Sequence, residues 1–301
     1  MHHHHISSSR PGLVSGLFIA CAALAICVTD LQAQLPAPAS EIVQLSTRMR
    51  VEVGDQVAIG GFIITGTAPK SIIIRGIGPS LLQSGITDAL ADPVLELHGP
   101  GNFQTVTNDN WRDTQMQAIL SAGLPPTNSL EPAIWATLQP GAYTAILRGT
   151  HNSTGTALVE IYDLNSAADS KVGNLSTRAF VGAAQNIAIA GFIVSGSGAS
   201  DEVVIRGLGP SLAAAGVSNV LANPTLELRN NNGSLLVSNN DWENNLVQSQ
   251  QITAAGLAPT NSLEAAVVAI LPPGRYTAML FGANDGVGNG LIEVYDLGAP
   301  L

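Results

Sequence analysis

Cysteine is nearly absent from this 301-residue chain. Its two cysteines, Cys21 and Cys27, both lie in an apolar stretch at residues 11–28. The rest of the chain can therefore form no disulfide and carry out no thiol chemistry, so its stability must come from core packing. Domains of roughly 120 residues can achieve this, because they bury around two-thirds of the surface of their unfolded chain.

Positive charge is also scarce. The chain has 12 Lys and Arg against 22 Asp and Glu, a formal net charge of −10, and its only lysines are Lys70 and Lys171. Such a surface repels nucleic acid and anionic lipid. We therefore expect no nucleic-acid partner, and no membrane contact by the mature protein.

The apolar stretch follows Arg10 and precedes Leu-Gln-Ala at residues 31–33, a plausible cleavage site. We predict a signal peptide at residues 1–33 and a linker at 34–44, which would make the protein secreted, periplasmic or attached to the cell surface. A retained membrane anchor is the alternative, because the stretch is close to spanning length. The Pro/Ala/Ser linker that follows it, without a basic cluster, favours cleavage.

The strongest feature of the sequence is an internal repeat. Seven short motifs occur twice in the same order, at an offset that grows from 130 residues (Arg48 to Arg178) to 133 residues (Glu131 to Glu264). In the first copy they are L-S-T-R (45–48), G-F-I (61–63), I-R-G-I-G-P-S-L (74–81), P-V-L-E-L (93–97), P-T-N-S-L-E (126–131), P-G-A-Y-T-A (140–145) and E-I-Y-D-L (160–164).

The repeat is longer than a solenoid unit, so we predict two tandem domains at residues 45–165 and 175–298, joined by a linker at 166–174. In each copy, runs of alternating apolar residues are separated by turn signals. About eight such runs a copy indicate an all-β fold of two antiparallel, jelly-roll-like β-sandwiches. We also expect one or two short helices in each copy, in the first at residues 80–90 and 112–122.

The repeated motifs resemble an uncharacterised tandem repeat of secreted proteins from environmental bacteria, over nearly all of residues 45–297. The second half of each copy is also similar to bacterial pre-peptidase C-terminal domains, through L-E-L at 95–97, N-D-N at 108–110 and residues 138–144. Those domains are jelly-roll modules appended to secreted enzymes and surface proteins. Both resemblances imply a β-sandwich in a secreted accessory role, and neither implies an active site.

Duplication provides a filter for chemistry, because a residue that the domain needs should occur in both copies. Histidine does not pass it: after the predicted leader only His98 and His151 remain, and Arg229 and Asn284 stand at their counterparts. A Ser-His-Asp triad or a histidine-rich metal site is therefore not expected. The chain also lacks the G-x-S-x-G, H-E-x-x-H and Walker patterns. We predict that the protein is not an enzyme.

Four acidic positions do pass the filter. Paired carboxylates can hydrolyse glycosides when they stand roughly 5–10 Å apart across a cleft, so a secreted hydrolase or lyase that uses Glu131 and Glu264, or Glu160 and Glu293, is one alternative. We favour structural ion pairs, in which Arg48 or Arg75 binds the shared acids and fixes strand register. The predicted structural set is Arg75, Glu96, Glu160, Arg206, Glu227 and Glu293.

An Asn/Asp cluster is the best metal candidate. Thr-Asn-Asp-Asn-Trp at 107–111 aligns with Ser-Asn-Asn-Asp-Trp at 238–242, and several side-chain oxygens in one loop suit Ca²⁺. The carboxylate changes position between the copies, so an Asx turn that caps a helix is the favoured interpretation. No other cofactor is expected. The candidate calcium ligands are Asn108, Asp109, Asn110, Asn239, Asn240 and Asp241.

Trp111 and Trp242 are shared by the copies. An exposed pair could stack on a sugar ring, so a carbohydrate-binding protein is a second alternative, although such residues more often pack in a core. The shared R-G-x-G-P-S run favours a structural turn over an anion-binding nest. We predict a secreted or surface non-catalytic module for binding, adhesion or spacing, whose partner, unknown from the sequence, would be a glycan or another surface protein.

Overall fold

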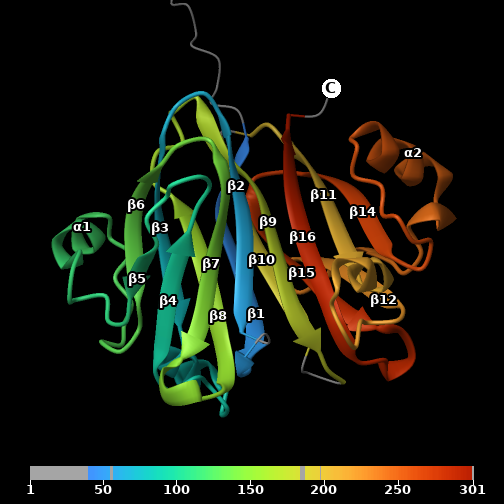
Figure 1. The fold of residues 1–301 in the computed structure, drawn as a ribbon. Coiled ribbons are helices and arrows are strands. Elements are labelled where there is room, and N and C mark those ends of the chain that lie inside the picture. The colour runs from blue at the N-terminus through green and yellow to red at the C-terminus, as the bar shows by residue number, and fades with distance from the viewer. Residues whose placement is uncertain (1–39, 55–56, 184–186, 197, 300–301) are drawn as a thin grey trace, which may run out of the picture. The chain divides into compact units, whose positions relative to one another are not determined.

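Two eight-stranded antiparallel sheets face each other in the computed structural model of this protein (Figure 1). The structure describes residues 40–54, 57–183, 187–196 and 198–299. The predicted signal peptide and most of the predicted linker lie outside these residues, while residues 41–44 of that linker belong to the first strand. The predicted all-β sandwich architecture is confirmed.

Among its described residues, the first repeat supplies eight strands, a short helix and two 3-10 turns. They are β1 (Glu41–Val51), β2 (Ala58–Gly66), β3 (Lys70–Ile77), η2 (Pro79–Ser84), β4 (Pro93–His98), β5 (Val106–Asn108), α1 (Met116–Ser121), β6 (Ala133–Leu138), β7 (Gly141–Gly149), η3 (Thr150–Asn152) and β8 (Gly155–Asp163).

The second repeat supplies the counterparts in the same order. They are β9 (Ser170–Val181), β10 (Ala188–Ser195), β11 (Asp201–Leu208), η4 (Pro210–Ala215), β12 (Pro224–Asn230), β13 (Leu235–Asn239), η5 (Trp242–Asn244), α2 (Leu246–Ala254), β14 (Ala265–Leu271), β15 (Gly274–Gly282), η6 (Ala283–Asp285) and β16 (Gly288–Gly298).

Alternation along the strands divides each sheet into a core face and an outer face. In β1, for example, Leu45, Thr47 and Met49 are buried between the sheets, while Ser46 and Arg48 point outward. This is the period of two that a half-buried antiparallel strand requires. The buried faces of both repeats form one hydrophobic cluster.

Both sheets run without interruption through the two repeats. Their strand orders are β13-β12-β15-β10-β1-β8-β3-β6 and β14-β11-β16-β9-β2-β7-β4-β5, so each sheet takes four strands from each repeat. The repeats meet where β1 pairs with β10 and β2 pairs with β9. We call these two pairings the seam.

The seam corrects the prediction of two separate domains. The described residues of both repeats belong to one compact unit, and the predicted linker at 166–174 is shorter than expected because β9 begins at Ser170. The physical reason is edge pairing: in separate sandwiches β1, β2, β9 and β10 would each expose a row of unpaired backbone donors and acceptors.

A pseudo-two-fold axis relates the two halves of the seam. Thr47 and its counterpart Thr177, buried on facing sheets, share a hydrogen bond of 2.9 Å between their hydroxyls. A residue bonded to its own counterpart lies on the axis, as in an isologous dimer interface. The two pairings of the seam also bring equivalent glycines close to the neighbouring strand. A Cβ at Gly61 or at Gly191 would come within 2.8 Å of a serine Oγ on that strand.

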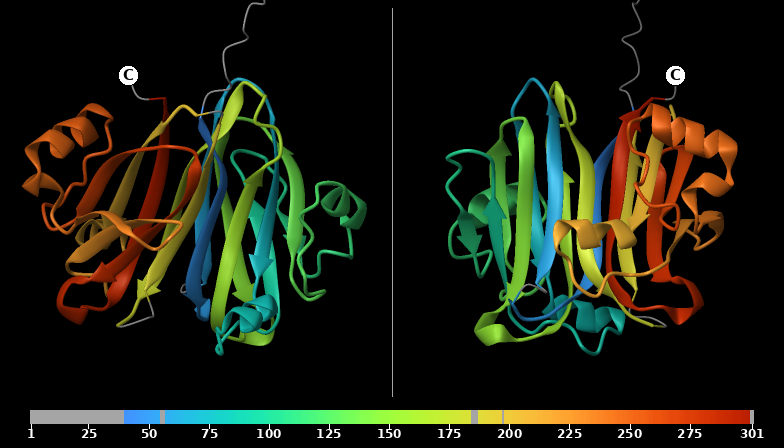
Figure 2. Two further views of the ribbon diagram at one scale, coloured as in Figure 1. Left: turned by 180° about the vertical axis from the view of Figure 1, so that it is seen from behind. Right: turned by 45° about the vertical axis from the view of Figure 1, so that its right-hand side comes forward.

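The helices lie at the outer ends of the sheets. α1 packs near β6 and α2 near β14, on opposite sides of the molecule in the views of Figures 1 and 2. The helix predicted at 80–90 is the shorter η2, which ends at Gly85 with a left-handed φ of 81°, and the one predicted at 112–122 is α1. Among the described residues, no helix has the length and hydrophobicity that crossing a membrane requires.

Cleavage between the repeats tests the seam. A protease site inserted in the loop between Ser166 and Asp169 should be cut without separating the halves, because the seam joins both sheets and buries Phe62 and Phe192. Each such side chain contributes roughly 1.5–3 kcal/mol of burial. Gel filtration should show cut and uncut protein eluting at the same volume. Elution of the cut protein at half the mass would contradict a shared pair of sheets.

Candidate functional site

The shared arginines bind the shared glutamates of the last strands. Arg75 on β3 stands opposite Glu160 on β8, and donates to Glu160 Oε2 from Nε at 2.9 Å and from Nη2 at 2.5 Å. It also donates to the Tyr162 hydroxyl at 3.0 Å and to the Leu124 carbonyl at 3.1 Å. Burial raises the pKa of Tyr162 to about 12, with a further contribution from the Glu160 charge.

The second repeat builds the same group. Arg206 donates from Nε to Glu293 at 2.7 Å, to the Tyr295 hydroxyl at 3.0 Å and to the Leu257 carbonyl at 3.1 Å. The predicted pairing of Arg75 and Arg206 with glutamates is therefore formed, and its effect is to tie the loop after each helix to the sheet.

Glu96 has different partners from those predicted. It accepts from Arg148 Nε at 3.0 Å and lies 3.1 Å from His98 Nε2, and its counterpart Glu227 accepts from Arg229 at 2.9 and 2.6 Å. Pairing with Arg48 or Arg75 was wrong because β4 lies in the opposite sheet from β1 and β3. The Arg148 bond lowers the pKa of Glu96 despite partial burial.

Glu131 fills the turn of the R-G-x-G-P-S motif. It is completely buried and accepts from the backbone N–H groups of Gly78 (3.0 Å), Ser80 (2.8 Å) and Asn128 (3.3 Å), and from the Ser80 hydroxyl (2.8 Å). The glycine is required because a Cβ at Gly78 would lie 2.3 Å from the Leu90 carbonyl oxygen. The turn is both structural and a nest for an anion, and the anion is the protein's own carboxylate.

Glu264 occupies the equivalent turn, where it accepts from the N–H groups of Gly209 and Ser211 at 3.0 Å each and from the Ser211 hydroxyl. Neither glutamate reaches solvent. Both carboxylates that the hydrolase or lyase alternative would use are thus buried and bound to the protein's own backbone, and that alternative stays a prediction.

The first asparagine of each Asn/Asp cluster joins the two sheets. Asn108 on β5 accepts from the Ala133 N–H of β6 at 2.9 Å and donates to the Asn110 carbonyl at 3.0 Å. Asn239 makes the same two bonds, with Ala266 and Asp241. These amides act as Asx-type connectors.

Of the other cluster residues, Asp109 is exposed, and Asn110, Asn240 and Asp241 are half-buried in the same loops. Asn110 donates to Asp113 at 3.2 Å, and Asp241 accepts from Asn244 at 3.1 Å. Partial burial raises the pKa of the Asp109 carboxyl, and the negative charges of Asp92 and Asp113 raise it further. In the described part of the chain no three His, Cys, Asp or Glu side chains converge as a metal site. The calcium hypothesis stays a prediction. Its remaining candidate ligands are Asp109, Asn110, Asn240 and Asp241.

Trp111 and Trp242, two of the shared aromatics that the carbohydrate alternative would use, are buried. Their exposed fractions are 3% and 9%. Trp111 packs with Ile73 and Ile119 beneath α1, and its indole Nε1 donates to the Asn128 carbonyl at 3.2 Å. A ring enclosed in this way has no face free to stack on a sugar.

The two lysines lie at one end of the seam, where sequence analysis assigned no site. Lys70 is 0% exposed, with Nζ 2.7 Å from Asp163 Oδ2 and donating at 2.7 Å to the Asn165 carbonyl. Lys171 lies with Nζ 2.5 Å from Asp296 Oδ1. Asp163 and Asp296 are counterparts in the repeat, so the last strand of each repeat binds one lysine.

Two further acids complete this group. Asp201, the counterpart of Lys70, is 0% exposed, and neither of its carboxylate oxygens has a hydrogen-bond partner. Burial, followed by the negative charge of Asp296, raises the pKa of Asp201 to about 7, and the positive charge of Lys171 opposes the shift. Glu41 is the counterpart of Lys171, and its pKa is raised by burial and then by Asp163. The seam cluster consists of Glu41, Lys70, Asp163, Lys171, Asp201 and Asp296.

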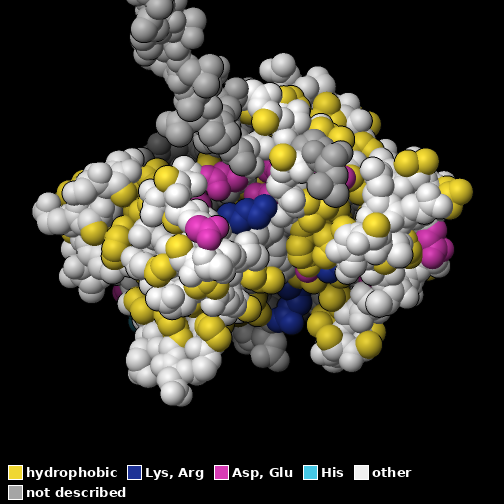
Figure 3. Space-filling view, turned by 90° about the horizontal axis from the view of Figure 1, so that it is seen from above, with side chains coloured by type: hydrophobic (Ala, Val, Ile, Leu, Met, Phe, Trp, Pro, Cys, Tyr) yellow, Lys and Arg dark blue, Asp and Glu magenta, His cyan; other side chains and the backbone are white. Residues whose placement is uncertain are grey.

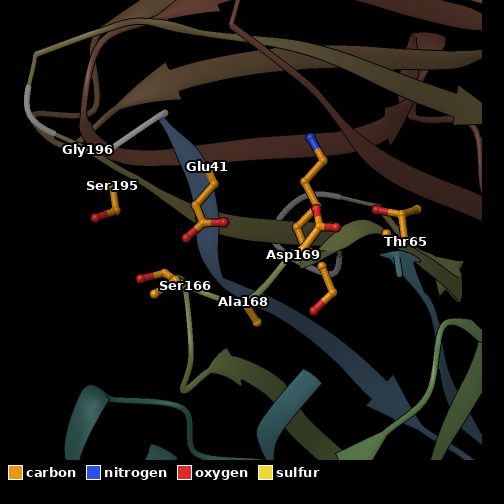
Figure 4. Close-up of a pocket in the computed structure, with 11 residues that line it drawn as sticks. Glu41, Thr65, Ser166, Ala168, Asp169, Ser195 and Gly196 are labelled. Atoms are coloured by element: carbon orange, nitrogen blue, oxygen red, sulfur yellow. The ribbon is translucent and has the colours of Figure 1, made fainter. Parts of the chain in front are cut away.

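A cavity of about 600 Å³ opens at the seam cluster. We call it the seam pocket; its lining residues are Glu41, Thr65, Gly66, Ser166, Ala167, Ala168, Asp169, Ser170, Lys171, Ser195 and Gly196. Glu41, Thr65 and Gly66 have Lys171, Ser195 and Gly196 as counterparts, so the pocket lies on the pseudo-two-fold axis. Figure 3 shows acidic and basic side chains gathered on this face, and Figure 4 shows the side chains of Glu41, Ser166 and Ser195 together at the pocket.

The fold and these contacts define an all-β protein of two repeats fused through both sheets. No family model and no curated protein matches the chain. Similar solved structures include one titled as the STIV MCP (10% identity, 87% of this chain and 96% of that one, TM-score 0.22) and a structure of Sulfolobus Turreted Icosahedral Virus (9%, 86% and 90%, 0.23). An 11S allergen from Cocos nucifera follows (8%, 84% and 81%, 0.16). At these TM-scores the likenesses carry no argument, and the resemblance to secreted bacterial repeats stays a prediction.

Replacement of Glu131 by Gln tests the internal nest. The amide keeps one acceptor but turns N–H donors toward the backbone N–H groups that the carboxylate binds, so we expect stability to fall by about 2–3 kcal/mol. Urea unfolding measures this. Glu243→Gln, at an exposed acid outside these contacts, should change stability little. Equal stability of both variants would contradict the bonding described for Glu131.

Replacement of Asp201 by Asn tests the buried acid through pH. The folded state keeps a proton on Asp201 up to about pH 7, whereas the unfolded chain releases it near the ordinary pKa of about 3.9. Between these values the unfolded state binds fewer protons, so this group lowers stability by about 1.4 kcal/mol per pH unit as the pH rises. Asp201→Asn should remove that slope in urea unfolding and be the more stable protein above pH 7. An unchanged slope would disprove the assignment, and Glu243→Gln should retain it.

Proposed function

We propose that the protein is a secreted or cell-surface, non-catalytic β-sandwich module that binds or spaces a partner outside the cell. The proposal rests on one observation: the acidic residues that occur in both repeats contact the protein's own backbone and side chains. Glu131 and Glu264 accept hydrogen bonds from the backbone of turns. Glu160 and Glu293 accept hydrogen bonds from arginines. Asp163 and Asp296 form ion pairs with lysines. The carboxylates retained in both repeats thus act on the protein's own backbone and cations.

The same contacts argue against acid–base catalysis by these residues. A general acid needs a pKa near the working pH and access to the bond it protonates. Glu160 accepts two hydrogen bonds from the guanidinium of Arg75 and a third from the Tyr162 hydroxyl at 3.1 Å, so both of its oxygens are occupied by donors from the protein itself. Glu131 is sealed from solvent.

The seam favours a role that depends on a fixed arrangement of the two repeats. Backbone hydrogen bonds join the repeats in both sheets, and Thr47 and Thr177 join the sheets across the core. Hinge motion between the repeats would have to break these ladders. A module of this kind can present a surface or hold attached parts at a set distance.

The double variant Glu160→Gln plus Glu293→Gln tests the proposal. We expect lower stability, by roughly 1–3 kcal/mol at each site, because a half-buried arginine loses the carboxylate that accepts its hydrogen bonds. We also expect no turnover, by wild type or variant, on panels of glycosides, esters and polysaccharides that lyases cleave. Urea unfolding and chromogenic assays supply the readouts. Turnover by the wild type that disappears in the folded double variant would overturn the non-catalytic proposal.

A further inference from the structure

One arginine beside the seam has no acceptor from the protein. Arg48 lies on the outer face of β1 and is half-buried, yet it makes no hydrogen bond, ion pair or ring contact with any residue that the structure describes. The side chains opposite it on the neighbouring strands, Leu158 and Ile189, are apolar and cannot accept from a guanidinium. Arg75, on the same face of the same sheet, is bound by Glu160. The five N–H donors of Arg48 are thus left for water or for a ligand.

Arg48 lines a cavity of about 360 Å³ at the end of β1, which we call the arginine pocket. This cavity is separate from the seam pocket, which lies at the start of the same strand, beside Glu41. Its volume is that of a site for a small organic molecule. Its wall includes Arg48, Arg50, Glu52, Ile86, Asp88 and Phe180.

The other charged side chains of the arginine pocket are paired with one another. Arg50 donates to Glu52 Oε1 at 2.5 Å and to Asp88 Oδ2 at 2.8 Å. Asp88 Oδ2 also accepts from the Thr156 hydroxyl at 3.0 Å. The two arginines and the two acids balance in total charge, but Arg50 holds both carboxylates, so Arg48 is left without a counter-ion among the described residues.

This arrangement of charge selects among anions. The planar guanidinium fork matches the two oxygens of a carboxylate, which it can bind through two parallel hydrogen bonds. A doubly charged phosphate would also match the fork, but it would face Glu52 and Asp88 with twice the repulsion. A single negative charge is therefore favoured.

The rest of the wall offers apolar surface. Phe180 is 40% exposed, and Ile86 is half-buried. A ligand that covers such side chains gains free energy in proportion to the apolar area removed from water. An anion with an apolar body therefore fits this pocket better than a small, fully hydrated one.

We propose that the arginine pocket binds an organic monocarboxylate, with the carboxylate on the Arg48 guanidinium and the apolar body of the ligand on the wall that Phe180 and Ile86 provide. The free fork of Arg48 supplies the charge and the directional hydrogen bonds, and the apolar wall supplies the remaining contact. This inference rests on the proposed binding role and names a ligand class for one cavity of the protein.

Isothermal titration of the full chain with benzoate at neutral pH tests the proposal. Arg48→Gln should weaken binding by about tenfold or more, because it removes a charge-assisted pair of hydrogen bonds. Arg48→Lys should weaken it by a few-fold, since lysine keeps the charge without the fork. Phe180→Ala should also weaken it, through lost apolar contact. Arg275→Gln, at an exposed arginine of β15 outside the pocket, should bind like the wild type.

Three further ligands serve as controls. Benzamide has the shape of benzoate without its charge and should not bind. Acetate, which lacks the apolar body, and inorganic phosphate should each bind more weakly than benzoate. Affinity for benzoate should fall as the salt concentration rises, because salt screens a half-exposed ion pair.

Several results would overturn the proposal. These are no binding of benzoate at low ionic strength, equal binding by wild type and Arg48→Gln or Phe180→Ala, equal binding of benzamide, or tighter binding of acetate or phosphate than of benzoate. Circular dichroism on each variant confirms that it is folded. Failure here would leave the non-catalytic assignment intact, because that assignment fails only if enzymatic turnover is found.

Discussion

Backbone pairing across the seam is the constraint on which the rest of the structure depends. Each repeat on its own would end its two sheets at β1 and β2, or at β9 and β10, with open edges. Pairing β1 with β10 and β2 with β9 closes all four edges at once. It merges two hydrophobic cores into one and creates the axis on which Thr47, Thr177 and the seam pocket lie.

Within each repeat, buried ionic groups fix the loops rather than perform chemistry. The R-G-x-G-P-S turn exposes backbone N–H groups in a nest, and Glu131 or Glu264 enters it from the segment before β6 or β14. Arg75 and Arg206 then bind the loop after each helix to the last strand. Breaking such a group leaves an uncompensated buried charge, which explains in physical terms why both partners stand in both repeats.

The seam is also where the two repeats differ in charge. Lysine stands on β3 in the first repeat, at Lys70, and on β9 in the second, at Lys171. In the other repeat, the position equivalent to Lys70 holds Asp201 and the position equivalent to Lys171 holds Glu41. Because these positions converge at the axis, an asymmetric group of charges occupies a symmetric part of the fold.

The sequence by itself determined the repeat, the all-β class, the strands and the arginine–glutamate pairs, because these depend on local alternation, turn residues and shared motifs. It left the partner of the shared glutamates open between Arg48 and Arg75. Arg75 binds Glu160, but neither arginine binds Glu96, since which sheet a strand joins is not a local property. Only the tertiary structure decided that the repeats share both sheets, that Trp111 is buried and that Glu131 fills a nest. It also brought Lys70, Lys171 and Asp201 together. The sequence shows that lysine in one repeat is replaced by an acidic residue in the other. Only the edge pairing between distant strands brings these positions together.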